Sequence, residues 1–225
     1  MTSRHPTSAR HLLLALLAVV LSLPLTAQEV GVFPLNDSVF ARMAGASYKE
    51  GCPVGRAELR YVRVMHVDAQ GNEHLGELVC HHLIANDLLD IFTELYRQRY
   101  PIERMRLIDD YQGDDERSMQ ANNTSCFCYR PVAGSTRLSA HARGLAVDVN
   151  PLYNPCVKRR PDGTLHIQPQ TGSKYADRTV TSAYKLVRND LCYRLFIAHG
   201  FKWGGAWQSL KDYQHFESNY SVPSR

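Results

Sequence analysis

Three side chains with metal-binding chemistry lie in the second half of this 225-residue chain. His141 precedes a glycine, Gly144, and Asp148 follows within the apolar run 145–149; His215 lies near the end of the chain. A carboxylate in an apolar strand is costly to bury unless it is paired or bound to a cation. Metal binding would offset that cost, and Gly144 allows a turn that brings His141 back toward Asp148.

A second carboxylate accompanies the last of these histidines. Asp212 and His215 are three residues apart, which places them on one side of a helical turn or tight bend. If His215 is the third ligand, Asp212 lies beside the metal without binding it. Two histidines and one carboxylate leave a fourth position for water, as in catalytic zinc sites. Zinc lowers the pKa of its bound water to about 7, and a nearby carboxylate can take the proton. Taken singly, each residue also fits an ordinary loop or ion-pair role.

The N-terminus has the layout of a secretory signal peptide. Arg4 and Arg10 give a basic start, the run 12–21 is apolar, and a small residue follows at Ala27. The apolar run of about 10 residues is shorter than the roughly 20 that a membrane-spanning helix needs. An uncleaved membrane anchor is the alternative. We therefore expect a periplasmic or secreted protein with a signal peptide at 1–27, an N-terminal extension at 28–50 and one domain at 51–225.

Charge indicates no polyanionic partner. Removal of residues 1–27 takes away two arginines and no acids, so Lys and Arg fall from 26 to 24 against 22 Asp and Glu. The net charge falls from +4 to +2. This excess is too small to indicate nucleic-acid binding or attraction to an anionic membrane. We expect neither partner, and no stable membrane insertion after signal cleavage.

Cysteine usage points to an oxidising compartment. Six cysteines follow the signal segment, and an even number in an exported chain suggests disulfides. The sequence alone does not choose among the possible pairings. A cysteine zinc site at Cys126 and Cys128 is the alternative, but zinc pairs usually leave two to four residues between cysteines.

Alternating and helical patterns predict an α+β fold, with a small antiparallel sheet and flanking helices. Strand-like alternation occurs at 59–67, at 75–80 across a turn at 68–72, and at 102–108, 145–149 and 164–167. Apolar residues recur at helical spacing over 85–99 and 183–199. Residues 109–125 are acidic and polar and are expected to form a long loop.

The motifs that carry this chemistry resemble those of a known family. Ser139-x-His141-x-x-Gly144-x-Ala146-x-Asp148, with a later Asp212-x-x-His215, is similar to the D-alanyl-D-alanine carboxypeptidase family of zinc peptidases. That family includes D-Ala-D-Ala dipeptidases and phage endolysins that cut L-alanyl-D-glutamate bonds. The resemblance covers residues 50–217 and is closest to a secreted branch. It rests there on the segments 123–127 and 150–155.

The resemblance implies a hedgehog/D,D-peptidase-like fold and zinc held by His141, Asp148 and His215. It also implies Asp212 as the acid/base and an upstream arginine that binds substrate and the developing oxyanion. Arg130 fits that place best, with Arg137 and Arg143 as rivals. Ser139 would hydrogen-bond substrate or a ligand, or serve only the turn. Tyr153 would line the cleft, with packing as its alternative, and His166 is a further candidate for substrate contact.

Two departures from the family pattern stand out. Relatives carry Trp-Gly-Gly-Asp-Trp where this chain has Ala206 between Gly205 and Trp207. Loss of a carboxylate that orients a ligand can cost about 10–100-fold in metal affinity or activity. Cys128 and Cys156 replace an Asn and an aromatic residue; they are expected either to form a disulfide that braces the site or to be separate thiols. Cys52 with Cys80 is the next candidate pair.

The expected activity is zinc-dependent hydrolysis of a peptide bond in peptidoglycan stem peptides, by D,D-carboxypeptidase or dipeptidase action. The expected partner is a peptidoglycan-derived peptide. L-alanyl-D-glutamate endopeptidase activity is the alternative within the enzyme class. A non-catalytic cell-wall-binding module with a structural zinc is the alternative from another class, and Ala206 favours it while Asp212 argues against it.

Overall fold

The computed structural model describes residues 29–132 and 134–220, so the expected signal peptide at 1–27 lies outside the described residues. The predicted α+β class is confirmed: helices pack with several small, mostly antiparallel sheets in place of one sheet. Within the described ranges, no helix is both long and apolar enough to span a bilayer.

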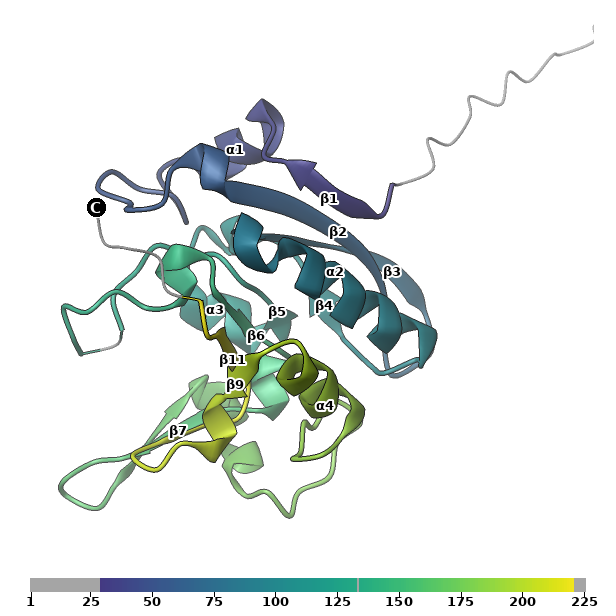
Figure 1. Ribbon diagram of the computed structural model, residues 1–225. Coiled ribbons are helices and arrows are strands. Elements are labelled where there is room, and N and C mark those ends of the chain that lie inside the picture. The colour runs from purple at the N-terminus through teal and green to yellow at the C-terminus, as the bar shows by residue number, and fades with distance from the viewer. Residues whose placement is uncertain (1–28, 133, 221–225) are drawn as a thin grey trace, which may run out of the picture.

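The first sheet contains the longest strands of the described chain (Figure 1). Strands β2 (Leu59–Val67) and β3 (Glu73–His81) form an antiparallel hairpin, and β1 (Gly31–Pro34) pairs with the other edge of β2. Helix α2 (His82–Arg97) lies along this sheet and buries the apolar residues that recur along it. The hairpin and the helix were both predicted from the sequence, within a few residues of their observed ends.

Apolar residues cover both faces of that sheet. Alternate strand residues Val62 and Val64 join the main core under α2, whereas Leu59 and Val79 join a second cluster on the opposite side. Helix α1 (Asp37–Met43) supplies part of the second cluster. The segment 28–50, set apart in the sequence analysis as an extension, thus contributes a strand and a helix to the fold from residue 29 on.

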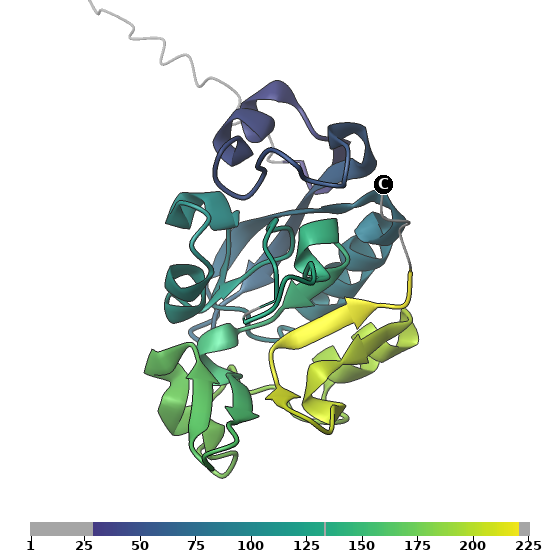
Figure 2. The ribbon, with the colours of Figure 1, turned by 90° about the vertical axis from the view of Figure 1, so that its left-hand side faces the viewer.

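The second half of the chain builds two further sheets (Figure 2). One has the order β6-β11-β9 and the other the order β10-β7-β8. Helix α4 (Leu191–Ala198) packs beside β9. The strands are β6 (Ala146–Asp148), β7 (Cys156–Arg159), β8 (Leu165–Gln168), β9 (Phe201–Trp203), β10 (Lys211–Asp212) and β11 (His215–Ser218).

Short elements connect these sheets. A parallel pair joins β4 (Arg104–Met105) to β5 (Asn123–Thr124), and helix α3 (Asp115–Gln120) lies between them. The remaining 3-10 turns are η1 (Arg56–Glu58), η2 (Ile108–Tyr111), η3 (His141–Arg143), η4 (Pro151–Tyr153), η5 (Gln170–Ala176) and η6 (Gly204–Ala206).

Three predicted elements were wrong in extent. The strand at 102–108 shrinks to β4, and the loop at 109–125 contains α3, whose first turn is capped by the Asp114 side chain. The helix predicted at 183–199 begins only at Leu191 because Asp190 caps it and Asn189 has a left-handed backbone (φ 70°). Local capping residues ended the helical pattern where apolar spacing alone did not.

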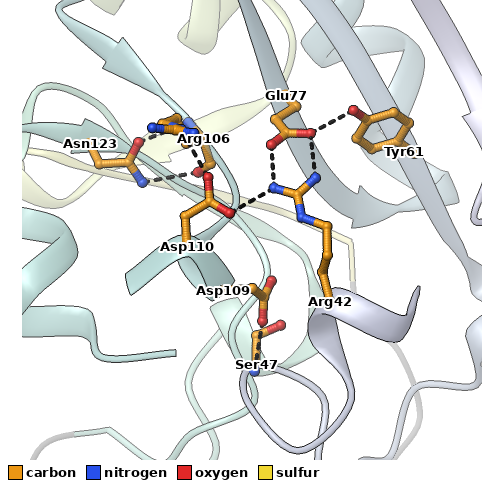
Figure 3. A network of polar contacts seen from close by, with 8 residues as sticks. All are labelled: Arg42, Ser47, Tyr61, Glu77, Arg106, Asp109, Asp110 and Asn123. Carbon is orange, nitrogen blue, oxygen red and sulfur yellow. Dashed lines mark hydrogen bonds and ion pairs between the residues drawn. The ribbon is translucent and has the colours of Figure 1, made fainter. Parts of the chain in front are cut away.

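A polar network ties the N-terminal segment to the loop that follows β4 (Figure 3). The Arg42 guanidinium donates to both carboxylate oxygens of Glu77 at 2.6 and 3.0 Å and to Asp110 at 2.9 Å. Nearby, Ser47 N–H donates to Asp109, and the Ser47 carbonyl accepts from Tyr129 N–H at 2.9 Å. Through these contacts, the N-terminal segment supports the backbone at Tyr129, in the stretch that leads to His141.

We expect Arg42→Ala to lower the free energy of unfolding by about 1–3 kcal/mol, because it leaves the partly buried Glu77 carboxylate without its cation and Asp110 with Arg106 alone. Arg97→Ala is the matched control, since its pair with Glu94 lies on an exposed helix face and should contribute less than about 1 kcal/mol. Urea unfolding of the two variants measures the difference. Equal losses would contradict a special role for the Arg42 network.

Candidate metal centre and its cleft

Asp148 and His215 lie directly opposite each other in the antiparallel pair of β6 and β11. Side chains of directly paired residues point to the same face of a sheet. The His215 Nδ1 atom lies 3.0 Å from Asp148 Oδ1, and both residues are buried. The strand pairing therefore fixes two of the three predicted ligands without any help from the loops between them.

His141 approaches the same point from the turn η3. Its Nδ1 donates to the Cys126 carbonyl at 2.6 Å, which leaves Nε2 facing Asp148 and His215. Gly144 ends the turn with a left-handed backbone (φ 65°), and a Cβ there would meet the His81 backbone nitrogen at 2.7 Å. The close approach of this turn to β3 therefore requires glycine.

The three side chains form a group with the geometry of a metal site. His141 Nε2 lies 3.2 Å from His215 Nδ1 and 3.3 Å from Asp148 Oδ2. A tetrahedral ion with bonds of 2.0–2.1 Å separates its ligands by about 3.3 Å. These nitrogen and oxygen atoms therefore have the spacing that a tetrahedral divalent ion requires, and the group could hold a metal ion.

Electrostatics holds the buried carboxylate in its charged form. Burial alone would raise the pKa of Asp148, but attraction and hydrogen bonds from His141 and His215 lower it well below its usual range. For His215, burial alone would lower the pKa, whereas hydrogen bonds to Asp148 and Glu217 raise it. The attraction between Asp148 and the two histidines holds the three side chains together, and bonds to a metal ion would take its place.

Asp212 lies beside this group on β10. Burial, followed by repulsion from Asp148, raises the pKa of Asp212 to about 6 against the opposing effect of His215 and His141. Its Oδ1 is buried without a hydrogen-bond partner among the described residues. Such an atom is rare in folded proteins and often marks a functional site.

The Trp-Gly-Gly turn backs both Asp212 and His215. A Cβ placed on Gly204 would lie 2.9 Å from the Asp212 Cβ and 3.3 Å from the His215 Cβ. A side chain at Gly204 would push the carboxylate and the imidazole apart. The glycine therefore allows the candidate base to lie next to the candidate ligand.

A cleft of about 570 Å³ opens onto this group, and Arg130, Ser139, Arg137 and Arg143 line it. Arg130 pairs with Asp115 at 2.7 Å, and its Nε has no hydrogen-bond partner among the described residues. Ser139 lines the cleft, and its Oγ also accepts from His141 N–H at 3.2 Å. Of the predicted substrate contacts, Arg130, Ser139 and His166 line the cleft, as do Arg137 and Arg143, the rivals of Arg130.

Tyr153 does not line the cleft, in contrast to the prediction. Its ring packs against Tyr175 at 4.7 Å and Tyr184 at 5.1 Å between centroids. Its position in η4 directs it into this aromatic cluster and away from the metal group. Its role in the structure is packing, which was the alternative.

All six cysteines have free thiols in the structure, so neither expected pair is a disulfide. Cys128 Sγ lies 4.0 Å from the Gly113 carbonyl, whereas Cys156 lines the cleft opposite Asp212 in the β7–β10 pair. Of the two interpretations of Cys128 and Cys156, separate thiols match this arrangement.

Glu217 is a site residue that the sequence analysis missed. Its Oε2 lies 3.5 Å from His215 Nε2, the ring nitrogen that faces away from Asp148. Carboxylates in this position orient a ligating histidine. Glu217 supplies a carboxylate beside the histidine although Ala206 does not. The signal was available, because residues two apart on a strand share a face.

Trp207 also borders the site. Its ring lies 5.3 Å from the His215 ring between centroids, and it lines the cleft, whereas Trp203 packs in the core. Trp207 thus combines packing on His215 with a place in the cleft wall.

Comparison with known families supports the resemblance drawn from the motifs. Residues 133–218 match the family described as D-alanyl-D-alanine carboxypeptidase, and this segment contains His141, Asp148, Asp212 and His215. Over this segment, less than half of its length, the chain is similar to that family of peptidases. Arg130 lies outside the matched segment, so its assignment depends on the motifs and the geometry. No curated protein and no solved structure matches the chain.

We expect Glu217→Gln to weaken divalent-metal affinity about tenfold, because the amide loses the charge that steadies the His215 ring. Competition with a chromogenic chelator measures the affinity. Glu94→Gln makes the same chemical change on an exposed helix face far from the site and should leave the affinity unchanged. Unaltered affinity in the Glu217 variant would exclude the orienting role.

Proposed function

We propose that this chain is a zinc-dependent peptidase that hydrolyses stem peptides of peptidoglycan, by D,D-carboxypeptidase or dipeptidase action. The observation that carries the proposal is the spacing of 3.0–3.3 Å among His141 Nε2, Asp148 and His215 Nδ1, with Asp212 beside them. The family match supports the reaction class. Secretion or periplasmic location is part of the proposal, because the expected substrate lies outside the cytoplasm.

The residues of the chain divide the reaction among them. Zinc held by His141, Asp148 and His215 would polarise the scissile carbonyl and lower the pKa of the attacking water. Asp212 accepts the water proton and returns it to the leaving amine. Arg130, held in position by Asp115, places its free N–H groups toward the oxyanion or grips the peptide. The buried group excludes bulk water and strengthens each of these interactions.

Removal of the base is the direct test. We expect Asp212→Ala to lower turnover of defined muropeptides at least about 100-fold while one zinc ion stays bound, since Asp212 contributes the proton transfer and no ligand atom. Mass spectrometry of the products measures turnover, and elemental analysis measures zinc. His141→Ala is the matched variant and should lose both zinc and turnover.

The products also distinguish the possible activities. Release of the terminal D-alanine indicates a carboxypeptidase, release of the free dipeptide from D-Ala-D-Ala a dipeptidase, and cleavage between L-alanine and D-glutamate an endopeptidase. Bound zinc without any product from these peptides would identify a non-catalytic wall-binding module. Retained turnover in Asp212→Ala would refute the base assignment.

Turnover should fall in acid. Burial raises the pKa of Asp212 to about 6, and only the deprotonated carboxylate can accept a proton. A bound divalent cation favours the charged carboxylate, so we expect kcat/KM to decline as pH falls through a midpoint at or below about 6. A pH profile of kcat/KM measures this limb. A midpoint well above that value would assign the limb to another group.

A further inference from the structure

The small sheet β10-β7-β8 forms one wall of the cleft and carries a row of cleft-lining side chains beside the base. Asp212 pairs with Cys156, and Cys156 pairs on its other side with Gln168. One step along β7, Lys158 pairs with His166. All five residues line the cleft, because alternate strand residues share one face.

This face becomes cationic with distance from the base. Arg160 continues the alternation after Lys158, and its N–H still donates to the Thr164 carbonyl at 2.8 Å. Each two-residue step along a strand covers about 7 Å. Lys158 and Arg160 therefore start about 7 and 14 Å along β7 from Cys156, the residue opposite Asp212.

Two more cations line the same cleft from the segment before and after His141. Arg137 is exposed and Arg143 half-buried. Apart from Asp148 and Asp212, the carboxylates of the cleft already have partners: Asp115 pairs with Arg130, and Glu217 with His215. In the described parts of the chain, none of the four cations forms a close ion pair with a carboxylate. Arg137 attracts Glu217 from a distance, and the Arg160 guanidinium donates to His166 Nδ1 at 3.1 Å.

From this arrangement we propose that the cleft selects acidic peptides, with free carboxylates two to four residues before the cleaved bond. The proposal rests on the carboxypeptidase form of the proposed function, since a D-Ala-D-Ala dipeptide has only one residue before its bond. An extended peptide advances about 3.3–3.6 Å per residue, so 7–14 Å along β7 corresponds to roughly two to four residues. A carboxypeptidase has only one residue after the cleaved bond, so the acidic residues lie on its N-terminal side.

A matched pair of peptides tests the selection. Both are acetylated pentapeptides that end in D-Ala-D-Ala; one has Glu and the other Gln at the second and third positions. We expect the Glu peptide to have about fivefold higher kcat/KM, as exposed charge pairs usually contribute at this level, and to lose the advantage in high salt. Binding of both peptides to the Asp212→Ala variant, measured by fluorescence anisotropy, gives the same comparison without turnover.

Charge reversal locates the selection. Lys158→Glu and Arg160→Glu should each lower the preference for the Glu peptide at least about threefold. Arg188→Glu is the matched control, because Arg188 is exposed and outside the cleft and the variant has the same net charge. The two wall variants should keep their zinc content, and their loss of kcat/KM should be larger for the Glu peptide than for the Gln peptide.

The outcomes separate this inference from the proposed function. Hydrolysis of both peptides with equal kcat/KM, or equal affinity of both for Asp212→Ala, overturns the acidic selection alone. If neither peptide is hydrolysed, with or without added zinc, the proposed activity is overturned. The binding comparison still decides the selection for acidic peptides. An equal loss of preference in Arg188→Glu would assign the effect to overall charge and overturn the role of the β7 wall.

Discussion

A carboxylate buried between two imidazoles is the interaction on which the rest of this structure depends. Asp148 would be costly to bury alone, and its position opposite His215 in the β6–β11 pair supplies the first compensation. His141 completes the group from a separate turn. Because these attractions act over about 3 Å in a water-poor interior, small displacements of any one element weaken all of them. The surrounding fold can be understood as the means of holding three short segments in register.

Support for the group comes from both halves of the chain. The β2–β3 hairpin meets the His141 turn where His81 N–H donates to the Gly144 carbonyl, and the Cys126 carbonyl directs the His141 ring. The N-terminal segment holds the Tyr129 backbone through Ser47. The Trp-Gly-Gly turn closes the other side. Precise placement of the ligands therefore depends on backbone contacts distant in sequence, which agrees with the small size of each local element.

Sequence reasoning identified His141, Asp148, His215 and Asp212 as a candidate site because their types and spacing are chemically unusual. The structure brings the three candidate ligands together and places Asp212 beside them. Sequence reasoning also located the β2–β3 hairpin and α2, whose apolar periods extend over many residues. It failed for Tyr153, for the start of α4 and for α3, where tertiary packing or a single capping residue outweighs a weak pattern. Glu217 and the cationic face of β7 were missed because their meaning depends on which strand faces the cleft.

The strand register between β6 and β11 has an evolutionary consequence. Only the alignment of His215 with Asp148 matters for their meeting, so the long excursion between them can change in length and composition without moving either side chain. A single inserted or deleted residue within either short strand would instead turn one partner to the opposite face of the sheet. Diversification of such a scaffold toward new substrates is thus channelled into the intervening loops and hairpin, while the two strands tolerate substitution but no change in length.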